Sequence, residues 1–226
     1  MNKKIYFIGV GGSRCATNWI AQCLREHPEL YVTFPNETHF FMPKKGTPSD
    51  FELEGIEGYY KRFKKTDKKS GEFSPGYIYY PEIADIIKKY FPDIKVIISL
   101  RNPVERAKSD FLNLKYYEMP GKIKSGILSN PEGVLDRSRY SPGLKRFLEL
   151  FPKKNIKIVI VEDMYPPGGK EKMIMELYTF LGVNPKFVPP SINLREHTLA
   201  IPKNNLLMNY FKMMSNLAVF FKKINA

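Results

Sequence analysis

The 226-residue sequence predicts an α/β fold, a doubly wound parallel sheet with helices on both faces. Short runs of β-branched and aromatic residues alternate with segments of helical periodicity, and parallel strands need such connections. Right-handed crossovers then pack the helices back onto the sheet. A chain of this length can bury one continuous core, so we expect a single domain over residues 1–226.

The predicted strands and helices follow one another along most of the chain. Strands are expected at residues 4–10, 30–34, 94–100 and 156–162, where short apolar runs end at glycine, proline or polar residues. Helices are expected at residues 17–26, 49–63, 81–91, 103–117, 141–151 and 170–182. The segment GEFSPGY at residues 71–77 is interpreted as a turn.

Two further segments have a weaker pattern. Residues 118–139 are rich in Gly, Pro and Ser, which indicates a mobile loop or lid. Residues 204–223 have helical apolar spacing, and from residue 203 onward the chain carries four lysines and no acidic residue. This pattern predicts a basic C-terminal helix that either completes the core or contacts a membrane surface peripherally.

The charge of the chain indicates an anionic partner. A formal net charge of +13 at pH 7 attracts phosphate, sulfate, nucleic acid or acidic lipid. The lysine-rich run at residues 61–69 is interpreted as a solvated face. No apolar run is long enough to cross a bilayer, and the apolar run near the N-terminus is too short for a signal peptide. Because Cys15 and Cys23 suit a reducing compartment, we expect a cytoplasmic protein.

The stretch IGVGGSRCATNWI at residues 8–20 joins a strand end, a glycine-rich turn, an arginine and a helix start. It fails the Walker pattern, which needs a lysine after its last glycine, and the dinucleotide pattern, because Arg14 stands at the third glycine. The N–H groups of a helix N-terminus together with Arg14 nevertheless suit a phosphate-like group. The alternative is a tight turn whose arginine faces solvent.

The stretch SLRNPVERAKSDF at residues 99–111 places Arg101 directly after the clearest predicted strand. Asn102 suits a helix cap and Pro103 the first helical position. Ser109 lies away from the apolar stripe of that helix, so it is either free to meet a ligand or an exposed serine. The stripe predicted to face the core consists of Val104, Ala107, Phe111 and Leu114.

Both stretches follow strands, and in doubly wound folds ligands bind beyond the carboxyl ends of the strands. The residues after Val10, Phe34 and Leu100 are therefore expected to converge on one crevice. The histidines and cysteines show no metal-ligand spacing, so no metal is expected.

Together these stretches resemble the sulfotransferases that use 3′-phosphoadenosine-5′-phosphosulfate (PAPS), in particular their heparan-sulfate and bacterial branch. RCATNW at residues 14–19 is similar to the 5′-phosphosulfate loop K-x-G-T-T-x-W/L, and LRNPVERAKSDF to the 3′-phosphate motif R-x-P-x-x-R-x-x-S. NETHFF at residues 36–41 resembles K-E-x-H-F-F, and GEFSPGY resembles G-E-K-[ST]-P-x-Y. The resemblance covers residues 4–185 and implies a P-loop-NTPase-like sulfotransferase fold.

The resemblance implies an enzyme that moves a sulfuryl group from PAPS to a hydroxyl or amine acceptor, with a glycan among the candidates, and releases the 3′,5′-bisphosphate PAP. Glu37 is then the catalytic base, and His39 either assists it or is structural. Arg14 holds the transferring group, and Trp19 either stacks on adenine or packs in the core. The implied donor-binding residues are Arg14, Cys15, Ala16, Thr17, Asn18 and Trp19 at the phosphosulfate end, and Arg101 and Ser109 at the 3′-phosphate.

The sequence departs from the family pattern at three positions. Arg14 stands where the family has lysine, and Asn36 and Phe73 replace two lysines expected on the acceptor side. Glu72 is interpreted as structural. Two other functions compete with sulfuryl transfer. A kinase or other phosphoryl transferase is disfavoured by the missing G-K-[ST], and a basic nucleic-acid-binding module lacks a zinc, helix-turn-helix or RNP signature. We therefore expect no nucleic-acid partner.

Overall fold

The computed structural model of the chain describes residues 4–44, 46–116 and 133–194. The described strands are β1 (Ile5–Gly9), β2 (Leu30–Val32), β3 (Lys69–Phe73), β4 (Lys95–Leu100) and β5 (Ile156–Ile160). The described helices are α1 (Thr17–Glu26), α2 (Asp50–Lys61), α3 (Pro81–Tyr90), α4 (Pro103–Tyr116), α6 (Ser141–Leu150) and α7 (Gly169–Leu181). These helices confirm the six predicted between residues 17 and 182 to within two residues at each end. The predicted helix 204–223 and residues 118–132 of the predicted loop lie outside the described residues.

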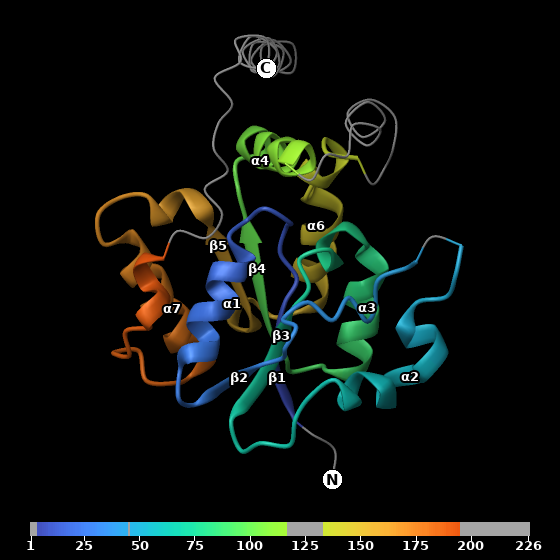
Figure 1. Cartoon of the computed structure of the whole chain (residues 1–226). Helices are drawn as coiled ribbons and strands as arrows, with labels where there is room; N and C mark the ends of the chain where they lie inside the picture. The colour runs from blue at the N-terminus through green and yellow to red at the C-terminus, as the bar shows by residue number, and fades with distance from the viewer. Residues whose placement is uncertain (1–3, 45, 117–132, 195–226) are drawn as a thin grey trace.

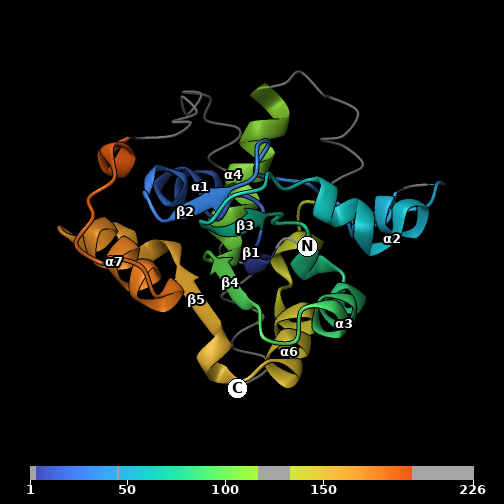
Figure 2. The same ribbon diagram turned by 90° about the horizontal axis from the view of Figure 1, so that it is seen from below.

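The strands form a parallel sheet in the order β2-β3-β1-β4-β5. Helices α1 and α7 cover one face of the sheet, and α3 and α6 cover the other, as Figure 1 and Figure 2 show from two directions. Trp19 and Leu177 pack in the first of the two resulting cores, and Ile83 and Phe147 pack in the second. This arrangement confirms the predicted doubly wound parallel sheet.

Strand β3 shows that the prediction of a turn at residues 71–77 is wrong over its first three residues. It pairs with both β2 and β1 in the interior of the sheet. Its sequence KSGEF lacks an apolar run, because Phe7 packs against the bare backbone of Gly71 and the carboxylate of Glu72 is buried by hydrogen bonds. Phe73 lies in the apolar core beside Gly9, with 1% of its surface exposed, so this position does not face an acceptor.

The loop after β1 lies directly on β4. A Cβ atom on Gly11 would stand 2.2 Å from the backbone nitrogen of Ser99, so only glycine fits there. The Val10 N–H donates to the Ile97 carbonyl at 2.9 Å, and the Gly12 N–H donates to the Ser99 carbonyl at 2.9 Å. This close approach brings the start of α1 next to the carboxyl end of β4, from which α4 begins.

Helix α4 begins as predicted, and two of the three predicted stripe residues whose side chains the structure describes are buried. The Asn102 Oδ1 accepts a hydrogen bond from the Val104 N–H at 2.9 Å, which confirms the predicted cap. Val104 is exposed, so its predicted place in the core is wrong, whereas Arg106 is fully buried. Burial of this guanidinium is possible because it pairs with Asp110 at 3.0 Å and donates to the Ser138 Oγ at 2.8 Å.

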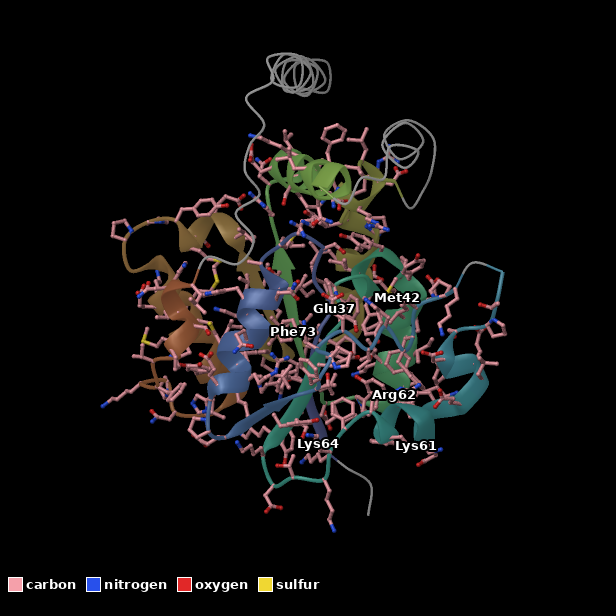
Figure 3. The ribbon with its side chains drawn as sticks, viewed as in Figure 1. Glu37, Met42, Lys61, Arg62, Lys64 and Phe73 are labelled. Carbon is pink, nitrogen blue, oxygen red and sulfur yellow. The ribbon has the colours of Figure 1, made fainter. Side chains whose placement is uncertain are left out.

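The lysine-rich run forms a solvated face, as predicted. Lys61, Arg62 and Lys64 lie in the lower part of the molecule in Figure 3, below Glu37. All three side chains are exposed, and Arg62 pairs with Glu54 at 2.6 Å. None of the described helices has the length and apolarity that a membrane-spanning segment needs.

Candidate active site

A cleft of about 580 Å³ opens beyond the carboxyl ends of β1 and β4. Its walls come from three separate stretches: Arg14 after β1, Glu37 after β2, and Arg101 after β4. Ser109 joins them from the second turn of α4. The structure thus brings together four residues that sequence reasoning had selected from stretches up to 95 positions apart.

The loop before α1 has the geometry of an anion-binding turn. Arg14 and Ala16 adopt left-handed backbone conformations, with φ of 67° and 57°. Such conformations are uncommon in residues other than glycine and concentrate at functional sites. Helix α1 begins at Thr17, where the first N–H groups have no helical acceptor and the helix dipole is positive. The Tyr79 hydroxyl accepts a hydrogen bond from the Ser13 N–H at 2.8 Å and supports the loop from behind.

Arg101 lines this cleft, and its guanidinium has an N–H group that can still donate a hydrogen bond to a ligand. Its Nη1 lies 3.5 Å from the Arg14 carbonyl oxygen, and its Nε is buried with no hydrogen-bond partner among the described residues. The Tyr140 hydroxyl donates to the Arg101 carbonyl at 3.2 Å and fixes the backbone of this position. A buried, unpaired N–H on a cation costs free energy until an anion accepts from it.

The two predicted anion sites adjoin each other. The Arg14 Nε donates to the Ser109 Oγ at 3.3 Å, so the loop after β1 contacts the helix after β4 directly. Both arginines line the same cleft, which is the arrangement that one doubly phosphorylated ligand needs.

The other predicted donor-binding residues are placed differently from one another. Thr17 and Asn18 line the cleft at the start of α1, and the Asn18 Oδ1 accepts from the Asn36 Nδ2 at 3.0 Å. Ala16 also lines the cleft, whereas Cys15 points into the core. Burial raises the pKa of the Cys15 thiol to about 11, so this side chain stays a neutral packing group and only its backbone is available to a ligand.

Trp19 is mainly a core residue. It is 4% exposed, packs between α1 and α7, and donates from Nε1 to the Ser191 carbonyl at 3.2 Å. One edge of the side chain reaches the cleft wall, where the Lys170 ammonium lies 5.6 Å from the ring centroid. Of the two predicted alternatives, the structure therefore favours packing in the core over stacking on a base.

Glu37 and His39 form an ion pair at the rim of the cleft. The Glu37 Oε2 lies 3.0 Å from the His39 Nε2, and both side chains are partly exposed. Hydrogen bonding to Glu37 raises the pKa of His39, so the imidazole stays protonated to a higher pH than usual. His39 is not enclosed by its aromatic neighbours Phe40 and Phe41, which are buried while it is exposed.

The buried carboxylate of Glu72 holds the segment that carries this pair. Its Oε2 accepts from the Thr38 N–H at 3.2 Å, from the Thr38 hydroxyl and from the Ser74 hydroxyl at 2.8 Å. Its Oε1 accepts from the hydroxyls of Tyr59 at 2.8 Å and Tyr77 at 3.1 Å. Burial raises the pKa of Glu72, and the five donors favour its charged form. Thr38 lies between Glu37 and His39, so Glu72 positions both.

A second cavity of about 360 Å³ adjoins the cleft on the side of α3. Met42, Tyr79 and Tyr80 line it together with His39 and Gly76. Ser13, Glu37 and Arg137 line both cavities, so the two spaces meet at these residues.

Sequence reasoning missed Lys170 and Arg137, two cations of the cleft. Lys170 lies at the start of α7, beyond the carboxyl end of β5, so the rule that selected Arg101 could have selected it too. Arg137 falls in the segment predicted as a mobile loop, where no periodicity distinguishes one basic residue from another.

Comparisons with known proteins find sulfotransferases that are similar to this chain. No protein-family model matches the sequence. The chain is 29% identical over 202 residues to the mouse heparan sulfate glucosamine 3-O-sulfotransferase 5, covering 81% of this chain and 54% of that protein. It is also 29% identical over 110 residues to the membrane-associated sulfotransferase kil1 of Dictyostelium discoideum, covering 46% of this chain and 22% of that protein. The chain thus spans about half or less of the length of these curated relatives.

Solved structures of sulfotransferases are similar in fold to most of the chain. A sulfotransferase from Alicyclobacillus acidocaldarius superposes with a TM-score of 0.71 at 25% identity, covering 87% of each chain. The sulfotransferase domain of the curacin biosynthetic pathway shares the fold, with a TM-score of 0.57 at 15% identity over 87% of this chain and 80% of that one. In sequence over 81% of its length, and in fold over 87%, the chain is thus similar to known sulfotransferases.

Proposed function

We propose that this protein moves the sulfuryl group of PAPS to a hydroxyl or amine of an acceptor and releases PAP. The observation that carries the proposal is the convergence of Arg14, Arg101 and Glu37 in one cleft. Two cations suit a donor with phosphate at both ends, and a carboxylate beside them suits an acceptor that must lose a proton. PAPS is the donor that the family resemblance implies.

The residues of the cleft fit such a donor. Arg101, with its unpaired buried Nε, and Ser109 would hold the 3′-phosphate. Arg14 and the first N–H groups of α1 would hold the 5′-phosphosulfate, where leaving-group charge develops. Each hydrogen bond to a charged group contributes about 1.5–3 kcal/mol. When bound, the donor supplies an activated sulfuryl group, and the protein supplies position and charge.

Glu37 is the group that takes the proton of the acceptor. Its side chain lines both cavities, so it reaches an acceptor in the smaller cavity while facing the donor cleft. The His39 imidazole, whose Nε2 lies 3.0 Å from the Glu37 Oε2, orients the carboxylate. As the acceptor oxygen or nitrogen bonds to sulfur, its proton passes to Glu37, and the electron pair of the broken sulfur–oxygen bond leaves with the 5′-phosphate of PAP.

A sugar hydroxyl is the acceptor that we favour. Two relatives are named for sulfation of a glucosamine oxygen. The cavity beside Glu37 is lined by Tyr79 and Tyr80, whose side chains combine an apolar ring with a polar tip. Release of PAP from PAPS, compared between a glucosamine oligosaccharide and p-nitrophenol as added acceptors, tests this choice. Faster release with p-nitrophenol would contradict it.

A cytoplasmic location is also part of the proposal. Cys15 and Cys23 are both buried in the apolar core, which suits a reducing compartment. Fractionation of cells with antibody detection of the protein tests the location, and recovery in a secreted fraction would contradict it.

Calorimetric titration with PAP and with 5′-AMP tests the donor. We expect clear preference for PAP, because 5′-AMP lacks the 3′-phosphate. Arg101→Ala should weaken PAP binding by about 10- to 100-fold, the equivalent of one charge-assisted contact. The matched control is Arg139→Ala, because Arg139 is an exposed arginine that lines neither cavity. Equal affinity for the two nucleotides would refute the proposal, and tight ATP binding would favour the phosphoryl transferase instead.

Glu37→Gln tests the base. The variant should keep its PAP affinity and lose at least about 100-fold in transfer rate, because general base catalysis contributes about this much. Undiminished transfer would assign proton removal to another group.

A further inference from the structure

The point where the two cavities meet is defined by three residues. Ser13, Glu37 and Arg137 line the donor cleft and also the cavity beside it. In an in-line transfer the sulfuryl group starts on the donor and ends on the acceptor, so it must cross this point. A residue that borders both spaces therefore lies next to the transferring group. Of the three, Glu37 is already assigned and Ser13 is neutral.

Arg137 is the cation at this point, and its guanidinium is not engaged by any described residue. It lies in the short 3₁₀ turn Asp136–Ser138 and is half-buried. Asp136 in the same turn pairs with Arg139 at 3.3 Å. Within residues 4–44, 46–116 and 133–194, no hydrogen bond or ion pair joins the Arg137 side chain to a neighbour. None of its five N–H donors is used by a neighbour within these ranges, and each can donate to a ligand oxygen.

The backbone on both sides of Arg137 is fixed by Arg106. The buried Arg106 guanidinium donates to the Ser138 Oγ at 2.8 Å and to the Val134 carbonyl. The Ser138 hydroxyl in turn donates to the Pro103 carbonyl at 3.0 Å at the start of α4. The turn that carries Arg137 is therefore attached to the helix that carries Ser109. This attachment gives a function to the second arginine of the stretch RNPVER, which donor binding does not use.

The charges at the meeting point call for a cation. The sulfuryl group carries negative charge on its oxygens, and the Glu37 carboxylate borders the same space. Like charges that border one cavity repel each other, and the repulsion strengthens as water is excluded. A guanidinium that lines the same cavity offsets this repulsion and can bond two oxygens at once.

On these grounds we propose that Arg137 is a catalytic residue that binds the sulfuryl oxygens during transfer; this inference rests on the proposed function. The bonds that form and break are those already described, with the proton on Glu37 and the leaving electron pair on the 5′-phosphate of PAP. Arg137 donates hydrogen bonds throughout and neither gains nor loses a proton.

PAP and PAPS differ only in the sulfuryl group, so a comparison of their affinities tests the contact between Arg137 and that group. PAP and PAPS are titrated without acceptor into the wild type, Arg137→Gln and Arg137→Lys. Arg139→Gln is the matched control, because it removes the same charge from the same segment at a side chain that is 80% exposed. We expect Arg137→Gln to weaken PAPS binding by about tenfold or more, with PAP affinity changed less than about twofold. Arg137→Lys should recover part of the loss, and Arg139→Gln should change neither affinity.

The slow release of PAP from PAPS in water supplies a second readout, and we expect Arg137→Gln to reduce it. Equal weakening of PAP and PAPS binding would make Arg137 a general nucleotide contact and overturn the inference. Unchanged affinity for both would overturn it as well. Failure of the proposed function has a separate signature, because the wild type would then not distinguish PAP from 5′-AMP.

Discussion

The two walls of the cleft are built in different ways. One wall, residues 10–17 and 100–109, is the one that we propose binds the donor, and we call it the donor wall; it consists of strand ends, a glycine turn and two helix starts. The other wall, residues 36–42 and 133–138, is the one that we propose faces the acceptor, and we call it the acceptor wall. Its regular structure is a single 3₁₀ turn, and two buried charged side chains, Glu72 and Arg106, hold it in place. Backbone geometry therefore places the groups of the donor wall, whereas side-chain hydrogen bonds from distant elements place those of the acceptor wall.

This difference has a functional consequence. Changes at the buried charges should disturb transfer more than donor binding, because they loosen the wall that carries Glu37 and Arg137. Changes in the loop before α1 should act on the donor wall instead. Stability, PAP affinity and transfer rate, measured on the same variants, separate the two walls.

The largest loss in the free energy of unfolding is expected for a substitution of Arg106. Arg106→Ala leaves the buried Asp110 carboxylate without its partner and removes the hydrogen bonds to Ser138 and Val134. Breaking a buried ion pair in this way costs about 3–5 kcal/mol. Urea denaturation measures the loss, and Arg139→Ala is the exposed control. The double variant Arg106→Met, Asp110→Leu should recover part of the loss, because it leaves no orphaned charge. A loss below about 1 kcal/mol for Arg106→Ala would show that the pair is not buried in solution.

The next largest loss in the free energy of unfolding is expected for a substitution of Glu72. In Glu72→Gln the amide replaces one carboxylate oxygen with a donor, so hydroxyl or N–H groups that pointed at that oxygen lose their acceptor. Leaving buried donors unsatisfied costs about 1–3 kcal/mol. Transfer should slow as well, because Thr38 no longer fixes Glu37, while PAP affinity should stay close to the wild type. Glu82→Gln on the exposed face of α3 is the control. A parallel loss of PAP affinity would mean that the two walls are not independent.

The same difference explains how much of the molecule could be predicted from sequence. The donor wall follows from local patterns: a strand of apolar residues, then glycines, then a capped helix with Pro103 at its first position. The convergence of Arg14 and Arg101 follows because parallel strands end at one edge of the sheet. For helix α4, the apolar stripe predicted a buried Val104, which is exposed, and did not predict the burial of Arg106.

The acceptor wall could not be predicted in this way. Strand β3 has no apolar run, because a glycine and a carboxylate stand among its buried positions, and the partners of that carboxylate come from Thr38, Tyr59 and Tyr77. Arg137 lies in a segment without periodicity and is placed by Arg106, 31 positions earlier in the chain. Hydrogen bonds between residues so distant in sequence leave no periodic signal. Sequence patterns therefore predict the strand ends but do not predict the side chains that face them.

A smaller effect is expected on the donor wall, at Ala16. Ala16 has a left-handed φ of 57°, which costs an L-residue about 1–2 kcal/mol. Ala16→Gly relieves this strain but adds about 0.4–1 kcal/mol of unfolded-state entropy, so a net gain of about 0.5–1 kcal/mol is expected. Ala21→Gly, in the middle of helix α1, which follows Ala16, should instead destabilise the protein by about 1 kcal/mol. Thermal unfolding measures both variants, and destabilisation by Ala16→Gly would show that the loop relaxes out of this conformation.

The smallest expected effect is a pH-dependent contribution of the Glu37–His39 pair in the acceptor wall to the free energy of unfolding. The pKa of His39 is raised above its ordinary value of 6.5 by Glu37, so the pair stabilises the native state fully below that pH. This contribution is lost as the pH rises through the folded-state pKa of His39. Because both side chains are partly exposed, we expect only a few tenths of a kcal/mol.

His39→Asn is the suitable variant for this measurement, because asparagine tolerates the left-handed φ of 51° at this position. The difference in urea midpoint between wild type and variant should be larger at about pH 6 than at about pH 9, where the imidazole is neutral in both states. PAP affinity should show no such difference between wild type and variant, since the pair belongs to the acceptor wall. A difference in midpoint that grows with pH would mean that the imidazole is buried neutral in the native state, and His39 would then be a packing residue of this wall and not the ion-pair partner of Glu37.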